Sequence, residues 1–540
     1  SILTGAVDLG ITIDPDFDTT EHNYEELLLA AQNGGSVTLT ENITITDEAP
    51  IVIDNGNTLT VDLNGKTITR ADGDNGQSGV WAFRVNNGTL ILNDATGTGT
   101  LDGGEGLEHS MLWANGENSK IIINSGNYTV GGNPDGNNYN VCVYASNGGQ
   151  VEIYGGTFEN EEPQTGSANL YPALNVSNGS PGTITVYGGT FKNYDPATGD
   201  DANGDTFVAT GYSSVQVSDD PTPNGTYQVV RGTGAATSTD LAKAIKSGAE
   251  LITLASDVTI DNSSVLSSTN HNSAIDLNGN TLTINGSETL YVSEGGNLTF
   301  SNGNIVANEI EKPEFTLFDA NANSSVTFDG VQLTTTGTGI GPANTASNIS
   351  ITIRNSELHC AAYAVATNAS MPVGENVKIT LENSKFYGNS TVFFNIPCEV
   401  TINNCEIYGD THGMVLRGGK ATVSNSTITL EYKDDDYKEI SKYFDNHDWE
   451  TGNKVNIAAL TVGNKSNGYQ YPSELHLINT KVISTGTHAS YFPALYSWAN
   501  QGEDLGVTIT YDDQTTFTGA TTYGSANITV NGEPAKVTEP

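Results

Sequence analysis

The chain has 540 residues, enough for two or more domains, and its 21 Lys and Arg residues against 63 Asp and Glu residues give a formal net charge of −42. This acidity would repel phosphates and excludes nucleic acid as a partner, whereas it suits a soluble exported protein. No stretch reaches the ~18 consecutive apolar residues of a membrane span, so we expect none, and we expect any export signal to have been removed before residue 1.

The first predicted element is a short amphipathic helix at 24–33, followed by a strand and the corner Asp62-Leu-Asn-Gly65. A similar helix and strand return at 239–254, and the corner returns at 276–279, an offset of 276 − 62 = 214 residues. This duplication predicts two domains, 1–231 and 232–540, joined by a linker near 225–238. Each helix is expected to cover the open strand edges at the start of its domain.

The first half repeats about every 30 residues, as an apolar-rich segment that leads into a second strand. The opening segments are Trp81–Phe83, Met111–Ala114, Val141–Tyr144 and Pro172–Leu174. The last two repeats contain Tyr-Gly-Gly-Thr-Phe, at 154–158 and 187–191. Since strand residues alternate between two faces, Tyr154 and Tyr187 should point outward and stack. Exposed aromatic rings bind sugars well, so both are candidate ligand-binding residues.

In the second half of the chain a short motif repeats: an apolar-polar-apolar triplet, followed two residues later by Asn in most copies. Its central apolar positions, at residues 300, 328, 353, 381, 402 and 423, lie 21 to 28 residues apart. Such a period, with strand alternation inside each copy, is typical of a β-solenoid. The Asn residues two places later should stack at one corner in the left-handed backbone conformation, among them Asn355, Asn383, Asn404 and Asn425.

Candidate catalytic residues lie in the segment 409–418, which contains Asp410, His412 and Arg417. A hydrolytic site needs a second carboxylate, for which the neighbouring repeat offers Glu431. An insertion at about 431–455 follows, and its acidic residues Asp434, Asp435 and Asp436 are weak candidates for a Ca²⁺ site. Because their spacing is not that of an EF-hand loop, we expect no cofactor unless calcium binds there.

The final repeats carry a second group of aromatic residues, and Tyr491, Tyr496 and Trp498 are further candidates for ligand binding. The four cysteines do not form a disulfide framework in a chain of this length. Buried thiols are the expected state, with a Cys398–Cys405 bridge as the alternative.

Taken together, the opening helix, the Asn-bearing repeats and the Cys-Glu-Ile-Tyr-Gly turn resemble the pectin-lyase-like superfamily. That resemblance implies two tandem right-handed parallel β-helices in an all-β protein. The Tyr-Gly-Gly-Thr-Phe turns and Asp-Leu-Asn-Gly corners are similar to surface or secreted proteins of gut bacteria, which implies an extracellular or cell-surface location. The superfamily contains lyases, hydrolases and adhesive stalks, so the resemblance indicates the fold and leaves the activity open.

The sequence favours an adhesin-like monomer that binds carbohydrate or a host cell-surface glycan over an enzyme. The chain has only five Arg residues and no paired-Asp motif in its repeated strand phrases, which argues against the lyase and hydrolase mechanisms of that superfamily. A polysaccharide-degrading hydrolase or lyase acting near Asp410 remains the alternative, and a structural spacer is the second alternative.

Overall fold

The computed structural model describes residues 22–46, 49–71, 80–103, 109–131, 140–161, 172–199, 206–222, 224–261, 272–286, 289–309, 316–367, 373–432, 457–464, 471–486, 492–499, 505–524 and 527–538. It divides into two compact units, Ser1–Arg231 and Gly232–Pro540. The described residues are mostly β-strand, with two α-helices, as the alternation of apolar and polar residues predicts.

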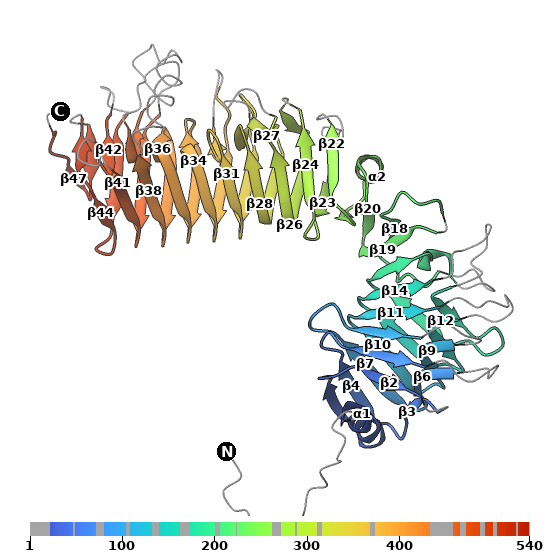
Figure 1. Ribbon diagram of the computed structural model, residues 1–540. Helices are drawn as coiled ribbons and strands as arrows, with labels where there is room; N and C mark the ends of the chain where they lie inside the picture. The colour runs from blue at the N-terminus through green and yellow to red at the C-terminus, as the bar shows by residue number, and fades with distance from the viewer. Residues whose placement is uncertain are drawn as a thin grey trace, which may run out of the picture. The chain divides into compact units, whose positions relative to one another are not determined.

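Unit 1 begins with helix α1 (His22–Asn33), which buries Leu27 and Ala31 and contacts the first strands. Three sheets follow, shown in Figure 1. The first contains β1 (Gly35–Thr38), β4 (Thr58–Asp62), β7 (Gly88–Asn93), β10 (Ser119–Ile123), β13 (Gln150–Ile153) and β16 (Thr183–Val186). The second contains β2 (Ile43–Ile45), β5 (Thr67–Arg70), β8 (Thr100–Asp102), β11 (Asn127–Val130), β14 (Thr157–Asn160), β17 (Thr190–Lys192), β19 (Thr226–Arg231) and β18 (Tyr212–Gln216). The third contains β3 (Ile51–Ile53), β6 (Val80–Val85), β9 (His109–Asn115), β12 (Val141–Ser146) and β15 (Leu174–Val176).

Within these sheets a strand pairs in parallel with the strand three places further along the chain, for example β7 with β10 and β10 with β13. We call one strand from each sheet, taken in chain order, a rung. At the end of the unit, β19 runs antiparallel to both β17 and β18. A turn of 3₁₀-helix, Pro196–Thr198, lies before this pair.

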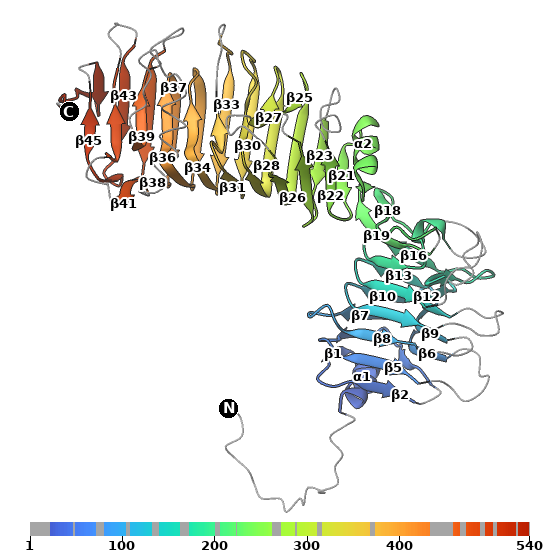
Figure 2. The same ribbon diagram turned by 45° about the horizontal axis from the view of Figure 1, so that its top comes forward.

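In unit 2, helix α2 (Ser238–Lys246) follows the first strand; it starts with a capping box between Thr237 and Asp240 and buries Leu241 and Ile245. Its strands form one connected network (Figure 2). They are β20 (Thr233–Ala235), β21 (Leu251–Leu254), β22 (Val258–Asp261), β23 (Asn272–Asp276), β24 (Thr281–Asn285), β25 (Leu290–Val292), β26 (Asn297–Ala307), β27 (Thr316–Ala320), β28 (Ser325–Thr335), β29 (Thr338–Pro342), β30 (Ile349–Arg354), β31 (Glu357–Cys360), β32 (Val365–Ala366), β33 (Val377–Glu382), β34 (Lys385–Phe394), β35 (Cys398–Asn403), β36 (Glu406–Arg417), β37 (Gly419–Ser424), β38 (Thr427–Tyr432), β39 (Ala458–Gly463), β40 (Ser473–Ile478), β41 (Lys481–Gly486), β42 (Leu495–Ser497), β43 (Val507–Tyr511), β44 (Thr516–Thr518), β45 (Thr521–Tyr523), β46 (Ile528–Val530) and β47 (Glu533–Pro534).

The pairings in this network form three parallel series, and each rung passes through all three series in chain order. The first series runs through β26, β28, β30, β33, β35, β37, β40 and β43. Another runs through β31, β34, β36, β38 and β41, and a third through β32, β34, β36, β39 and β42. The long strands β34 and β36 belong to both of the latter series because each bends at a corner.

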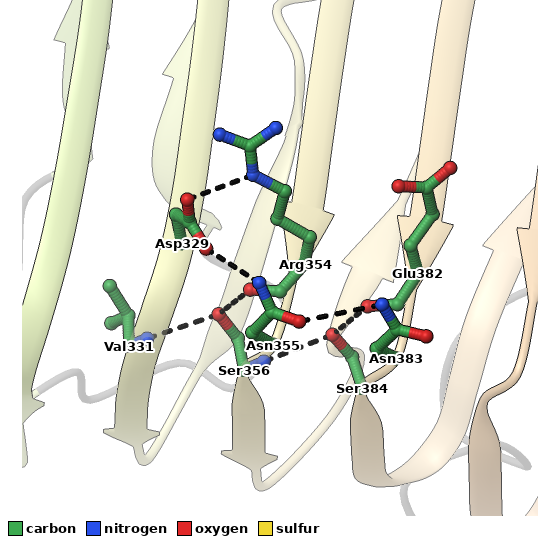
Figure 3. Close-up of polar contacts among 8 residues, drawn as sticks. All are labelled: Asp329, Val331, Arg354, Asn355, Ser356, Glu382, Asn383 and Ser384. Carbon is green, nitrogen blue, oxygen red and sulfur yellow. Dashed lines mark hydrogen bonds and ion pairs between the residues drawn. The ribbon is translucent and has the colours of Figure 1, made fainter.

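The corner between the first two series of unit 2 is held by stacked asparagines (Figure 3). Asn355, Asn383, Asn404 and Asn425 all have φ near +50°, the left-handed region that Asn tolerates. The Nδ2 atom of Asn383 donates to Oδ1 of Asn355 at 3.4 Å, and that of Asn404 donates to Asn383 at 2.8 Å. The predicted stack is confirmed, except that the amide of Asn425 donates to Asn403 rather than to Asn404.

A second polar row runs beside this stack. Ser356 and Ser384 are buried at the next position, and the Ser356 N–H donates to the Ser384 hydroxyl at 3.0 Å. The Ser356 hydroxyl in turn accepts from the Val331 N–H at 3.1 Å. Buried backbone N–H groups at this corner are thus satisfied by the next rung, which ties neighbouring rungs together.

The two units have separate apolar cores, and no residue belongs to both. All four cysteines are buried free thiols, so the expected state is confirmed and the alternative Cys398–Cys405 bridge is absent. Burial raises the pKa of the Cys142 and Cys398 thiols to about 12. These thiols act as small apolar side chains.

Candidate functional site

The most concentrated group of outward aromatic side chains in unit 1 is Trp81, Trp113 and Tyr144, which we call the tryptophan cluster. They lie on β6, β9 and β12 of the third sheet, and each is partly exposed. The ring centres of Trp81 and Trp113 are 4.7 Å apart, and Trp81 lies 5.6 Å from Tyr144. The rings are tilted by 32° and 30°. They therefore form a compact patch on three successive rungs.

The patch is held in place by hydrogen bonds from neighbouring polar side chains. The indole N–H of Trp113 donates to Ser146 Oγ at 2.9 Å, and Ser146 donates to Asn115 Oδ1 at 3.1 Å. The Asn115 amide donates to Asn86 Oδ1 at 2.9 Å. Since these contacts fix the Trp113 ring before any ligand arrives, binding would cost little side-chain entropy.

Arg84 lies on the same face, with its guanidinium carbon 4.1 Å from the centre of the Trp113 ring. Its Nε donates to Asn86 Oδ1 at 3.0 Å, which sets the plane of the guanidinium. An arginine has five N–H donors in a fixed fork, so the group offers directed hydrogen bonds beside an apolar surface.

Sequence reasoning missed the tryptophan cluster as a site and used Trp81 and Trp113 only as markers of the repeat. A signal was present: the three aromatic residues are separated by 113 − 81 = 32 and 144 − 113 = 31 residues, the repeat period of unit 1. Aromatic residues that recur at the rung period on the outward side of a strand come together in space.

Tyr154 and Tyr187, selected from the sequence, point away from the core, since Ile153 and Val186 before them are fully buried. Their ring centres lie 5.0 Å apart with the planes at 8°, and the Tyr212 ring stands nearly perpendicular to that of Tyr187, with the two ring centres 5.4 Å apart. The Tyr154 and Tyr187 rings cover each other on one face, and Tyr212 lies against Tyr187. The ring face that a ligand could reach therefore belongs to Tyr154, which is 49% exposed. The Tyr154 hydroxyl donates to Glu152 at 3.1 Å, and burial together with this bond raises its pKa.

The candidate catalytic residues of unit 2 all lie on β36. His412 is buried, and its Nδ1 atom is 2.7 Å from Ser390 Oγ on β34. Arg417 is also buried; its Nε donates to Asn395 Oδ1 at 2.7 Å, and its guanidinium lies 5.1 Å from the Phe393 ring centre. Asp410 is partly exposed at the corner before His412.

Two of the predicted aromatic candidates, Tyr496 and Trp498, lie two strands away from Arg417, on and directly after β42. Strand β39 lies between β36 and β42 and pairs with both. Thr461 on β39 is the Cα partner of Val415 on β36 and of Tyr496 on β42. Arg417 pairs with Gly463, and the Trp498 ring lies so close that a Cβ atom on Gly463 would be 2.5 Å from it. Tyr496 and Trp498 have ring centres 5.9 Å apart.

The sequence suggests Glu431 as the carboxylate partner of Asp410. Gly409 and Leu430 are the last pair of the register between β36 and β38, so Asp410 and Glu431 are the next residues of their chains, and from His412 onward β36 pairs with β39 instead.

Two predicted groups lie outside the described residues: Tyr491, and the acidic residues Asp434, Asp435 and Asp436 within the insertion. Among the described residues, no cluster of three or more His, Cys, Asp or Glu side chains is placed to hold a metal ion. No helix in the described part of the chain is long and apolar enough to cross a membrane.

The described residues define an all-β protein of parallel sheets whose outward faces carry aromatic, amide and arginine side chains. No family model and no curated protein matches the chain. A solved structure of sacteLam55A from Streptomyces sp. SirexAA-E is similar over 97% of this chain and 95% of its own, at 12% identity and a TM-score of 0.23. A variant of that protein in complex with glucose gives the same coverage and identity at a TM-score of 0.24. TM-scores this low support no conclusion about fold or function.

Proposed function

We propose that the protein is a secreted or cell-surface carbohydrate-binding protein of bacterial origin, adhesin-like and monomeric, and that each unit is a right-handed parallel β-helix. The architectural proposal is supported by the parallel pairing of each strand with its counterpart on the next rung and by the asparagines at the corners. A stiff stack of rungs presents side chains at a regular spacing along its outer faces.

The functional proposal is carried by the tryptophan cluster. Trp81 and Tyr144 offer partly exposed aromatic surface against which the C–H face of a sugar ring packs. Arg84 and the amides of Asn86 and Asn115 surround that surface with groups that bond to hydroxyls. The Tyr154 ring offers a separate, smaller platform on the same unit.

A glycan array followed by calorimetry on the best ligand tests this function. Each lost stacking ring removes on the order of 1 kcal/mol, so the double variant Trp81→Ala, Tyr144→Ala should bind roughly tenfold more weakly or worse. Trp113 is left in place because it anchors the hydrogen-bond network. The matched control is Tyr291→Ala, which removes a 50% exposed ring from unit 2 and should leave binding unchanged.

If the double variant binds as tightly as the parent chain, the tryptophan cluster is not the site. Binding that instead falls in the Tyr154→Ala, Tyr187→Ala variant would move the site to the tyrosine stack. An array with no bound glycan would contradict the proposed function and leave the structural-spacer alternative.

The second candidate function is polysaccharide cleavage near Asp410. The observation that favours it is that Asp410 and Glu431 each directly follow the last pair of the β36–β38 register, Gly409 and Leu430, and that His412 and Arg417 are buried further along β36. A reducing-end release assay on the same glycans decides between the two. Cleavage that vanishes in Asp410→Asn would establish the enzyme, and we expect no cleavage of pectate with or without calcium.

A further inference from the structure

We propose that unit 2 has a second ligand groove, separate from the outward aromatic residues and from β36, that binds a short neutral oligosaccharide. It is a hollow of about 840 Å³ at the start of strands β33, β35, β37, β40 and β43. This volume falls within the range of about 300–1,000 Å³ found for small-molecule sites. The groove stands independently of the proposed function, because it lies on the other unit and shares no residue with the tryptophan cluster.

The groove exists because a second row of corner asparagines is interrupted. Asn323, Asn348 and Asn376 have φ between +54° and +59° and occupy equivalent positions on successive rungs. The Asn348 amide donates to Asn323 at 2.9 Å, and the Asn376 amide donates to Asn348 at 3.0 Å. This row is a ladder like the one at the other corner.

The next equivalent positions are Pro397, Gly418, Pro472 and Gly506, as the strand register shows. Proline cannot adopt a positive φ and glycine has no side chain, so the amide ladder stops at Asn376. The hollow lies where the amide side chains of the ladder are missing, and both Asn376 and the 36% exposed Tyr471 line it.

A row of alternating charges lines the hollow. Lys378, Glu399, Lys420 and Glu474 are Cα partners on successive strands, so their charges sum to zero. Lys420 and Glu474 form an ion pair at 3.2 Å. Lys378 and Glu399 are both exposed and, among the described residues, neither forms an ion pair.

This arrangement suits a ligand that both donates and accepts hydrogen bonds. A lysine only donates and a carboxylate only accepts, whereas each hydroxyl of a sugar does both. One sugar ring of an oligosaccharide can therefore bridge Lys378 and Glu399, while another ring of the same chain packs its C–H face against Tyr471, which lies further along the series. A strongly charged ligand would be attracted by one of the two groups and repelled by the other.

The test uses the full chain carrying Trp81→Ala and Tyr144→Ala, so that glycan binding by unit 1 is already weakened. Cellotetraose is titrated against it, with a chitosan tetramer and tetragalacturonate as the cationic and anionic comparisons. We expect cellotetraose to bind, and Lys378→Met or Glu399→Gln to weaken that binding about tenfold each. The matched control Lys481→Met removes an exposed lysine elsewhere in unit 2 and should have no effect.

A blocking variant keeps the test independent of charge. Gly506 lines the groove, and a Cβ atom there would meet only Asn527 Oδ1, at 3.6 Å, so Gly506→Phe should fold and abolish binding. Unchanged thermal unfolding confirms that the variant is folded.

The proposal is overturned if no cellotetraose binds, if Gly506→Phe binds as well as its parent, or if a charged tetramer binds more tightly. Glycan binding by the unmodified chain that disappears with the tryptophan cluster would support the function proposed for unit 1 while overturning the groove.

Discussion

At the residue scale, Asp319 is the described carboxyl group whose pKa is shifted most by its surroundings. It lies on β27 between the Cα partners Tyr291 and Gly341. Burial raises its pKa from the usual 3.8 to about 7, although a hydrogen bond with Thr316 opposes this shift. Loss of hydration disfavours the ionised form, and no cation among its strand partners compensates.

This raised pKa predicts a pH-dependent stability for unit 2. Between about pH 4 and pH 7 the folded state keeps a proton on Asp319 that the unfolded state has lost. The free energy of unfolding should therefore fall as the pH rises through this window and then level off. Asp319→Asn should remove this fall and stabilise unit 2 at pH 8 by on the order of a few kcal/mol, with little effect at pH 4.

Urea unfolding at pH 4, 6 and 8 measures the effect. The exposed Asp513 gives the matched control, and Asp513→Asn should leave the pH profile unchanged. Parallel profiles for the parent and Asp319→Asn would show that this carboxyl group is hydrated and ionised normally.

At the scale of elements, each corner asparagine stabilises the fold in two ways: it adopts the left-handed backbone conformation, and its side-chain amide bonds to the neighbouring rung. Asn404 has a φ of +53°, and its amide donates to Asn383 at 2.8 Å. Asn404→Ala loses the amide bond and places a Cβ in the left-handed region, which together should cost about 2 kcal/mol of unfolding free energy. Asn404→Gly keeps the conformation without strain and should cost about half as much.

Chemical unfolding of unit 2 for both variants checks this order. An alanine variant as stable as the glycine variant would mean that the backbone conformation contributes nothing at this corner. Equal stability of the glycine variant and the parent chain would mean that the exposed amide ladder contributes nothing.

At the scale of the whole molecule, the two cores should respond separately to damage. Ile402 is fully buried in the core of unit 2. Ile402→Asp places an unpaired carboxylate between rungs, at a cost of several kcal/mol, and should unfold unit 2. Unit 1 should keep its own transition, because its core contains none of the same residues.

Differential scanning calorimetry distinguishes the two outcomes. Thr401→Asp is the matched control, since it adds the same charge to the same strand at an exposed position, and both transitions should survive in it. Loss of both transitions in Ile402→Asp would show that the two units fold as one.

The sequence by itself determined the β class, the two helices and the corner asparagines, because these depend on interactions within a few residues. Alternation of apolar and polar residues sets which side of a strand is buried, and Asn tolerates the left-handed conformation wherever it lies. The orientation of Tyr154 and Tyr187 followed from the same alternation.

Only the tertiary structure decided which distant residues meet. Stacked rungs bring residues that are roughly 20 to 35 positions apart in the chain to about 4.8 Å from one another. Trp81, Trp113 and Tyr144 form one patch for this reason, and Ser390 reaches His412. The groove beside Asn376 likewise depends on the register that aligns Pro397 and Gly418 with the asparagine row. Register is set by packing across the entire core, so no short stretch of sequence contains it.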